Sequence, residues 1–273
     1  MAKAAGKTIK RLDLRKLDLF GVGQRGRNQE ISASFAMPDR VPTGIPGLDE
    51  LIEGGFEKGG VILVAGDTGT GKSTFAMQYL YNGATIYNQP GVYLTFEEKK
   101  DEIFRHMLRY GWDLEKLEEQ QKLLVLQYPP HDIDRFILEG EIIEDTIKDM
   151  KAKRLAIDSI TSFALIFDTD YKRKLGIIKV LELLKKWGCT TLLTSEARAI
   201  GGGEIRARFG LGFLSDGLIH LYNIRQGDER QKAIEIVKMR GVAHSNLIVP
   251  FEFKQNGIEL YPNQPVFGGL ERK

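Results

Sequence analysis

Short apolar runs alternate with amphipathic stretches along the middle of the chain. Five segments are predicted strands: 61–65, which is a continuous apolar run, and 92–96, 123–127, 154–158 and 190–195. Such runs are typical of strands buried on both faces of a parallel sheet. Between them, apolar residues recur at helical spacing in four segments: 73–83, 101–110, 132–150 and 175–187. Gly140 lies inside the third of these and weakens the expectation of one unbroken helix.

The pattern changes after residue 195. Three further segments favour strands without long helices between them: 217–223, 233–240 and 247–253. Gly227 and Asp228 form a turn signal between the first two, which indicates an antiparallel hairpin. We therefore expect an α/β domain over 41–273, with a mostly parallel central sheet, helices on both faces and antiparallel C-terminal strands. Residues 1–40 are expected to form a basic N-terminal extension.

Composition narrows the class of protein. The chain has 273 residues, is 42% apolar, and carries 39 Lys and Arg against 37 Asp and Glu. Cys189 is the single cysteine, which excludes internal disulfides and is typical of a reducing compartment. No apolar run approaches the ~18–20 residues of a membrane span, and no apolar block follows the basic N-terminus as in a secretory signal. We expect a cytoplasmic protein whose basic arm is either a solvated terminus or a contact for nucleic acid or an acidic partner.

Residues 66–73 carry the clearest chemical signal. Their sequence, Gly-Asp-Thr-Gly-Thr-Gly-Lys-Ser, matches the phosphate-binding pattern G-x-x-x-x-G-K-[ST] between a predicted strand and a predicted helix. Backbone N–H groups of such a loop face a phosphate, and the helix N-terminus adds positive charge. Lys72 is expected to reach the β- and γ-phosphates, and Ser73 to join the coordination of Mg²⁺. The expected nucleotide contacts are Gly69, Thr70, Gly71, Lys72, Ser73 and Thr74.

Asp158 ends the apolar strand 154–158. Burying a carboxylate there is costly unless the group has a task, and next to a P-loop that task is to hold Mg²⁺, directly or indirectly. The alternative is a helix N-cap, because the hydroxyl residues Ser159, Thr161 and Ser162 follow. The phosphate-binding pattern favours the metal role.

Glu97 and Glu98 directly follow the strand 92–96. Two adjacent acids at a strand end can position a water for in-line attack on a γ-phosphate, one as general base and the other as its support. Kinases of small molecules do not need this base, because their acceptor is a substrate hydroxyl. The pair therefore favours hydrolysis, and the alternative is a solvated acidic pair.

Lys238 and Arg240 form a pair of cations near the end of the chain. The two-residue strand period places them on one face, roughly 6–7 Å apart. They repel each other unless an anion lies between them. That anion is a γ-phosphate in the same or a neighbouring subunit, or the pair simply protects an edge strand from aggregation. The residues alone favour neither.

Together, these features resemble the KaiC-like branch of the RecA/RadA ATPase superfamily. The resemblance covers roughly residues 41–255. The segments that carry it are 42–49, the P-loop, 95–98 (Thr-Phe-Glu-Glu), 110–114 (Tyr-Gly-Trp-Asp-Leu), 157–159, 208–210 and 238–241 (Lys-Met-Arg-Gly). The P-loop alone is generic, whereas Thr-Phe-Glu-Glu and Lys-Met-Arg-Gly together are specific.

The resemblance implies a RecA-type fold and a homo-oligomer, a hexameric ring with ATP between its subunits. It implies that Glu97 and Glu98 are catalytic and that Lys238 and Arg240 reach the γ-phosphate of the adjacent subunit. The other residues that it implies near the nucleotide are Met239 and His244, and, near the base or ribose, Arg109. The expected function is an Mg²⁺-dependent ATPase with shared active sites and a regulatory or signalling role toward a protein partner.

The chain departs from the family pattern in three ways. It has one ATPase domain, where the family's clock protein has two in tandem. The segment that matches the clock protein's autophosphorylated Ser-Thr pair is 210–216, Gly-Leu-Gly-Phe-Leu-Ser-Asp, so adjacent hydroxyls are missing although Ser215 is nearby. An autokinase activity is therefore not favoured. Val242 stands where a polar residue is expected beside the nucleotide.

Two other functions stay open. One is a RadA-like recombinase paralogue that binds DNA through two loops that face the axis of such rings. These loops are 163–174, with Lys172, Arg173 and Lys174, and 199–208, with Arg206, Arg208 and three mobile glycines. No aromatic residue is interleaved in the second loop to stack bases, which weakens this hypothesis. The other function is a nucleotide sensor or assembly platform with little turnover.

Overall fold

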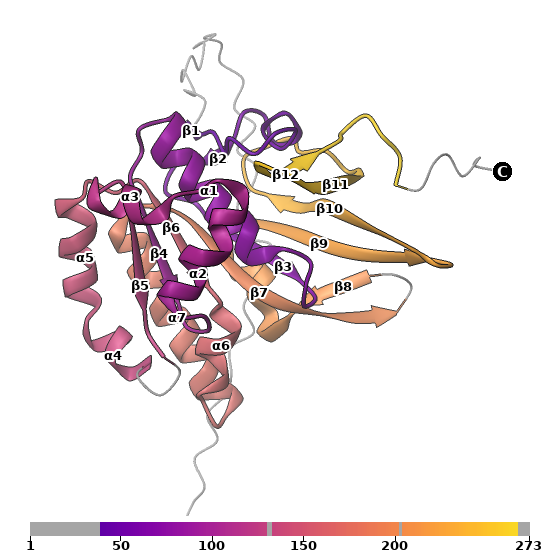
Figure 1. Cartoon of the computed structure of the whole chain (residues 1–273). Helices are drawn as coiled ribbons and strands as arrows, with labels where there is room; N and C mark the ends of the chain where they lie inside the picture. Colours follow the sequence, from indigo (N-terminus) through magenta and orange to yellow (C-terminus); the bar gives the residue numbers. More distant parts are fainter. Residues whose placement is uncertain (1–38, 130–132, 202–203, 267–273) are drawn as a thin grey trace, which may run out of the picture. The chain divides into compact units, whose positions relative to one another are not determined.

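A mostly parallel sheet forms the centre of the domain (Figure 1). The computed structural model describes residues 39–129, 133–201 and 204–266. The predicted basic extension lies outside these residues except for Asp39 and Arg40. The strand order is β12-β11-β10-β9-β3-β7-β6-β4-β5, and β8 pairs with β7. The strands are β3 (Val61–Gly66), β4 (Gly91–Thr95), β5 (Leu123–Gln127), β6 (Arg154–Asp158), β7 (Thr190–Gly201), β8 (Glu204–Ala207), β9 (Gly217–Gln226), β10 (Glu229–Met239), β11 (Ile248–Lys254) and β12 (Gly257–Leu260).

The predicted division of the sheet is confirmed. Strands β3 to β7 pair parallel with one another, and β9 pairs parallel with β3. The pairs β9–β10, β10–β11 and β11–β12 are antiparallel. A separate two-stranded sheet joins β1 (Arg40–Val41) to β2 (Phe56–Glu57). Sequence analysis did not predict β1, β2, β8 or β12, because each of them is four residues or shorter.

Helices cover both faces of the sheet (Figure 1). The helical elements are α1 (Lys72–Ile86), α2 (Lys100–Met107), α3 (Leu114–Glu119), α4 (Ile133–Leu138), α5 (Gly140–Asp149), α6 (Ile160–Leu165), α7 (Asp170–Trp187), α8 (Leu211–Leu214) and the short turns η2 (Asp49–Ile52), η3 (Leu108–Tyr110) and η5 (Arg208–Gly210). Alternate residues of β3 enter different cores: Ile62 packs on the side of α1, and Leu63 on the side of α7. Among the described helices, none has the length and apolar character needed to cross a bilayer.

The structure confirms the break expected at Gly140 and corrects two predicted loops. The segment 132–150 is two helices, α4 and α5, that meet at Gly140. The expected loop 163–174 is mostly helical, because the Thr169 hydroxyl accepts a hydrogen bond from the Lys172 backbone N–H and starts α7 at Asp170. The expected loop 199–208 belongs mainly to the β7–β8 hairpin, in which Ala199 pairs with Ile205.

Arg154 anchors the segment before β3 to the core. Its side chain is fully buried, and its guanidinium donates to the carbonyl oxygens of Tyr79 (2.8 Å) and Pro42 (2.6 Å) and to the Gln89 side chain (2.8 Å). The guanidinium also lies 4.5 Å from the ring centroid of Tyr79. Gly83 makes room for it, since a Cβ there would lie 2.4 Å from the Arg154 Cδ.

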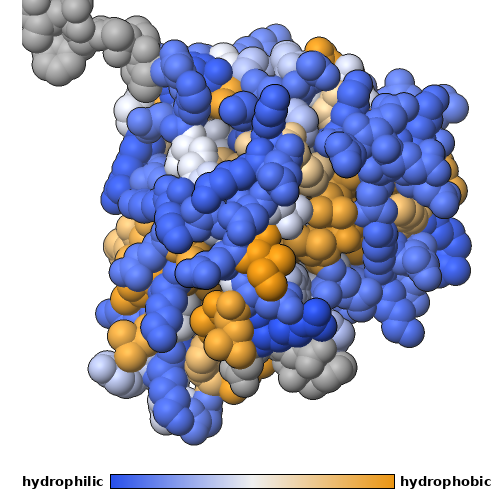
Figure 2. All heavy atoms as spheres, turned by 90° about the vertical axis from the view of Figure 1, so that its left-hand side faces the viewer, coloured by the Kyte–Doolittle hydropathy of each residue, from blue (hydrophilic) through white to orange (hydrophobic). Residues whose placement is uncertain are grey.

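The side of the molecule formed by α4 and α5 has a mixed surface. Figure 2 shows apolar side chains among polar ones on this side. Leu138 of α4 is 82% exposed and Ile142 of α5 is 61% exposed. Exposed apolar side chains are common on protein surfaces.

Candidate nucleotide-binding site

The P-loop connects β3 to α1 at the carboxyl edge of the sheet. Gly69 and Gly71 have φ angles of +77° and +103°, in the region that favours glycine. A Cβ on Gly71 would lie 2.5 Å from the Phe253 ring, so the loop cannot carry a side chain there. Gly71 is also the N-cap of α1 and supplies no side-chain acceptor. The first N–H groups of α1 are therefore available to an anion.

Two ammonium groups lie at this loop. The Lys72 Nζ donates to the carbonyl oxygens of Gly66 (3.1 Å) and Asp67 (3.0 Å). The Lys232 Nζ, from β10, donates to the carbonyl oxygen of Gly69 at 2.6 Å, and burial lowers its pKa. Sequence analysis missed Lys232, because a lysine on a C-terminal strand looks like an ordinary surface residue.

Asp158 lies at the end of β6 and is almost fully buried. Its Oδ2 accepts a hydrogen bond from the Tyr93 hydroxyl at 2.6 Å, and its Oδ1 accepts one from the Thr194 hydroxyl. Burial and the charge of Asp158 raise the pKa of Tyr93 well above its ordinary value, so this hydroxyl keeps its proton. The alternative N-cap role belongs instead to Ser159, whose hydroxyl accepts from the Ser162 backbone N–H.

Glu97 points toward the segment that follows Asp158. Its Oε1 accepts hydrogen bonds from the hydroxyls of Ser162 (2.5 Å) and Ser159. This contact arises because β4 and β6 are neighbours, so their carboxyl ends meet at one edge. Sequence analysis treated both serines only as capping residues, and the order of strands needed to bring them to Glu97 is not visible in the sequence.

Glu98 points elsewhere. Its carboxylate lies 2.5 Å from the His106 Nδ1 of α2. The backbone N–H groups of both glutamates donate to the Thr95 hydroxyl at 3.2 Å, which fixes the turn after β4. The two glutamates predicted as a pair therefore have different partners, Glu97 beside β6 and Glu98 beside α2.

Lys238 and Arg240 lie at the opposite end of β3 from the P-loop. The Lys238 Nζ donates to the Ser215 carbonyl oxygen (2.6 Å), and the Arg240 guanidinium lies 3.1 Å from the Asp216 carboxylate. Asp216 is in turn tied to Val61, the first residue of β3: its backbone N–H donates to the Val61 carbonyl oxygen (2.8 Å), and its Oδ2 accepts from the Val61 backbone N–H (3.0 Å). Burial lowers the pKa of Lys238, and the charge of Arg240 lowers it further.

The strand predicted over 233–240 is slightly wrong. A bulge between Ile236 and Lys238 shifts the register of β10, and the strand ends at Met239. Arg240 follows the strand, yet it still faces the same 212–216 segment as Lys238. The two-residue period alone would not describe this pair.

Among the remaining predicted residues, Met239, His244 and Arg109 have their contacts outside the P-loop. Met239 is buried against Gly217, and the His244 Nδ1 lies 3.0 Å from the Ser245 carbonyl oxygen. Arg109 is exposed on η3, 5.9 Å from the Tyr110 ring centroid. Ser73 and Thr74 lie in the first turn of α1, at the P-loop itself.

These features define a class of protein. The domain has a mostly parallel sheet, a glycine-rich phosphate loop after a central strand, and a buried aspartate at the end of a nearby strand. These features define a P-loop domain of the RecA type. A family model described as "ATPase: KaiC" matches residues 41–265. The chain belongs to the KaiC family of ATPases.

Individual relatives agree with this assignment. The chain is 38% identical over 238 residues to the circadian clock oscillator protein KaiC of Thermostichus vulcanus, covering 84% of this chain and 45% of that protein. It is 39% identical over 230 residues to KaiC of Prochlorococcus marinus strain SARG, covering 81% and 46%. The crystal structure of a KaiC-like protein from the hyperthermophilic archaeon Pyrococcus horikoshii OT3 matches with a TM-score of 0.74 and 40% identity, over 82% of this chain and 100% of that one. The chain thus spans slightly less than half the length of these curated relatives.

Proposed function

We propose that this chain is an Mg²⁺-dependent ATPase that works as a homohexameric ring with active sites shared between neighbouring subunits. The observation that carries the proposal is the distance between two sets of residues. The P-loop and Glu97 lie at the carboxyl edge of the sheet, whereas Lys238 and Arg240 lie at its other edge. Cations that cannot reach their own P-loop can serve the P-loop of a neighbour.

The nucleotide would be held by the backbone N–H groups of 69–74 and by Lys72, with Lys232 adding a second positive charge. A hydroxyl on Ser73 and a carboxylate on Asp158 are oxygen donors of the kind that Mg²⁺ binds together with phosphates and waters. The donor chemistry therefore fits the ion. When bound, Mg²⁺ would offset the negative charge that develops on the transferred phosphate.

Glu97 is the proposed general base. Its Oε1 accepts from Ser159 and Ser162, which orient the carboxylate toward the end of β6. The Oε2 atom would then accept a proton from a water that attacks the phosphate. Glu98 would act as support by holding α2 through His106.

Lys238 and Arg240 would contact the γ-phosphate of the nucleotide held by the neighbouring subunit. Both cations contact the 212–216 segment through carbonyls and Asp216, so a neighbour's phosphate would compete with these contacts. A cation supplied in trans stabilises the transition-state charge of phosphoryl transfer. The curated relatives are described as circadian clock oscillator proteins, which supports a regulatory role for the turnover. The proposed target of that regulation is a protein partner.

Phosphate release with Mg²⁺-ATP tests this function. Lys72→Ala should abolish turnover, and Glu97→Gln should lower kcat by about 10²–10⁴-fold, as expected for loss of a general base. Glu115→Gln, an exposed change of the same kind on α3, is the matched control and should leave turnover unchanged. Wild-type turnover no higher than that of Lys72→Ala would refute hydrolysis, and retained ATP binding would then favour the nucleotide sensor.

A further inference from the structure

Asp158 receives one side-chain hydrogen bond from each of the two strands beside it. On β4, the Tyr93 hydroxyl donates to its Oδ2 at 2.6 Å, and on β7 the Thr194 hydroxyl donates to its Oδ1. All three side chains are buried, with exposures of 1% for Tyr93, 0% for Thr194 and 5% for Asp158. A carboxylate has about four lone-pair sites, so these two donors fix its orientation and leave acceptor capacity on both oxygens.

The carboxylate projects from the face of the sheet that α1 covers. Tyr93 pairs with Ala156 in the parallel register of β4 and β6, and both residues belong to the core on the side of α1. By the two-residue period of β6, Asp158 shares this face with Ala156. α1 packs on β4, β6 and β7 (Figure 1) and carries Ser73 in its first turn. Asp158 and Ser73 therefore lie on the same side of the sheet, at its carboxyl edge.

The hydroxyl of Tyr93 is not needed for packing. Its ring belongs to the apolar core on the side of α1, where a phenylalanine would bury the same ring. A buried hydroxyl costs free energy unless it has a hydrogen-bond partner, and here that partner is Asp158. The backbone already joins the two strands at this point, because the Phe96 N–H donates to the Asp158 carbonyl oxygen at 2.8 Å. The Tyr93 hydrogen bond therefore sets the orientation of the carboxylate rather than the position of the strand.

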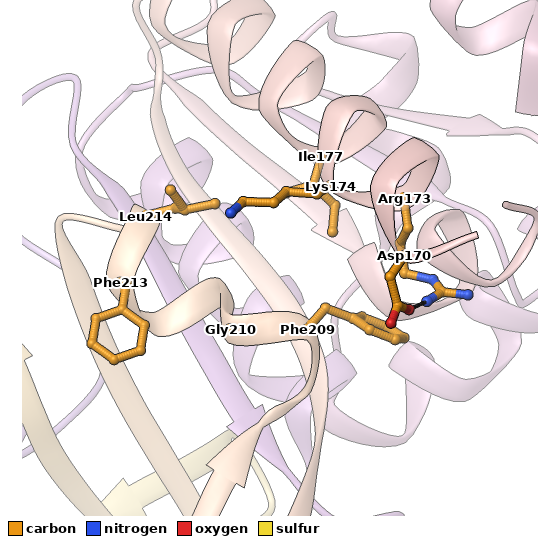
Figure 3. A pocket seen from close by; sticks show the side chains of 8 residues that line it. All are labelled: Asp170, Arg173, Lys174, Ile177, Phe209, Gly210, Phe213 and Leu214. Atoms are coloured by element: carbon orange, nitrogen blue, oxygen red, sulfur yellow. Dashed lines mark hydrogen bonds and ion pairs between the residues drawn. The ribbon is translucent and has the colours of Figure 1, made fainter.

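The polar groups around Arg173 form a contrasting arrangement. In Figure 3, Arg173 lies beside Asp170 at a cavity of about 460 Å³ that α7 helps to line. The Arg173 guanidinium also donates to the carbonyl oxygens of Ala164 (3.0 Å) and Phe167 (2.9 Å). These hydrogen bonds join the end of α6 to the start of α7, so they serve the fold. The donors to Asp158 instead hold a carboxylate at the edge of the sheet that carries the P-loop.

We propose that Tyr93 is a positioning residue for the metal: its hydroxyl holds the Asp158 carboxylate in the orientation that binds Mg²⁺, directly or through water. This inference rests on the proposed function, because it takes Asp158 as part of the Mg²⁺ site. Hydrogen bonds to a metal-binding side chain restrict its rotation, and their loss typically costs about 10–100-fold in metal affinity or activity. Thr194 acts on the other carboxylate oxygen in the same way. Tyr93 acts through Asp158 and not on the nucleotide itself.

Binding of a fluorescent ADP analogue to the full chain, measured in EDTA and over a series of Mg²⁺ concentrations, tests this role. In EDTA, Tyr93→Phe should bind the analogue as tightly as the wild type, because the P-loop is unchanged. The Mg²⁺ concentration that gives half of the metal-dependent increase in affinity should rise about tenfold or more. Tyr79→Phe is the matched control: it removes another buried tyrosine hydroxyl, which donates to the Thr190 carbonyl oxygen, and should leave this midpoint unchanged.

A double-mutant cycle separates positioning from a structural role. In an Asp158→Ala background, Tyr93→Phe should no longer move the Mg²⁺ midpoint, because its effect runs through the carboxylate. Thr194→Val removes the other donor, should raise the midpoint as Tyr93→Phe does, and carries the test if Tyr93→Phe does not fold.

Three results would overturn the proposal: an unchanged midpoint in Tyr93→Phe, an equal loss of affinity with EDTA and with Mg²⁺, or the same shift in both backgrounds. The titration needs no turnover. A wild type that releases no phosphate would therefore refute hydrolysis, and the result for Tyr93 would still be read from the Mg²⁺ midpoint.

Discussion

Mixed rings of two inactive variants give a sharp test of shared active sites. Glu97→Gln removes the proposed base, and Arg240→Ala removes the charge proposed for the neighbour. Arg240 is held by Asp216 beside Val61, and β3 rises from Val61 to Gly66 over five residue steps. At about 3.3 Å per step, Arg240 is anchored roughly 16 Å along the sheet from its own P-loop. In the proposed ring, the two defects therefore fall on opposite sides of one subunit interface.

The expected recovery follows from counting interfaces. In rings formed from equal amounts of the two variants, each interface receives its two sides independently. An intact Glu97 on the P-loop side meets an intact Arg240 on the other side at about one quarter of the interfaces. Each variant alone should be reduced about 10²–10⁵-fold, so the mixture should reach about 25% of wild-type turnover.

Phosphate release from subunits mixed without nucleotide and then supplied with Mg²⁺-ATP measures this recovery. Native mass spectrometry of a tagged and an untagged variant confirms that subunits exchange. A mixture of Glu97→Gln with the double variant Glu97→Gln/Arg240→Ala is the control, because it contains no intact Glu97 and should stay inactive. Exchanged rings whose turnover equals the average of the two parents would refute the shared site.

Three further predictions concern the fold. Arg154→Leu leaves buried carbonyl oxygens without a donor. It should lower the free energy of unfolding by roughly 3 kcal/mol and Tm by roughly 6–12 °C, as measured by urea and thermal melts. The exposed control Arg105→Leu should lower the free energy of unfolding by less than about 0.5 kcal/mol. Burial raises the pKa of Cys189 to about 11, so Ellman's reagent at pH 8 should label it only after denaturant is added. Rapid labelling of the native protein would contradict the burial of this thiol. Burial lowers the pKa of His220 below 6.5, with Glu235 acting in the opposite direction. In this pH range the unfolded state binds more protons at His220 than the folded state does, so the free energy of unfolding falls as pH drops from about 6.5 toward the lowered pKa. Urea melts at pH 7 and pH 5.5 should show a smaller loss in the free energy of unfolding for His220→Gln than for the wild type.

The sequence predicted the parts of the fold that depend on local pattern. The apolar run 61–65 and the alternation of short strand-like segments with helical ones identified the central parallel strands. Gly188, with a φ of +70°, ends α7 where expected. Short elements and the helical start at Asp170 were missed, because they depend on capping by Thr169 and on tertiary pairing. A basic triplet at a helix start has the same composition as a basic loop.

The candidate site was predictable to a similar extent. The P-loop follows from its pattern, since glycine is required at position 71 by the Phe253 ring. The partners of Glu97 and Asp158 come from other strands and helices, and only the strand order brings them together.

Light scattering of the purified chain tests the central claim most directly. The mass is measured with and without Mg²⁺-ATP, and phosphate release is assayed on the same fractions. The account predicts a hexamer whose turnover is lost in Glu97→Gln and in Arg240→Ala. A monomer that hydrolyses ATP as fast as any assembled fraction would contradict the shared site, and a hexamer without turnover would contradict hydrolysis.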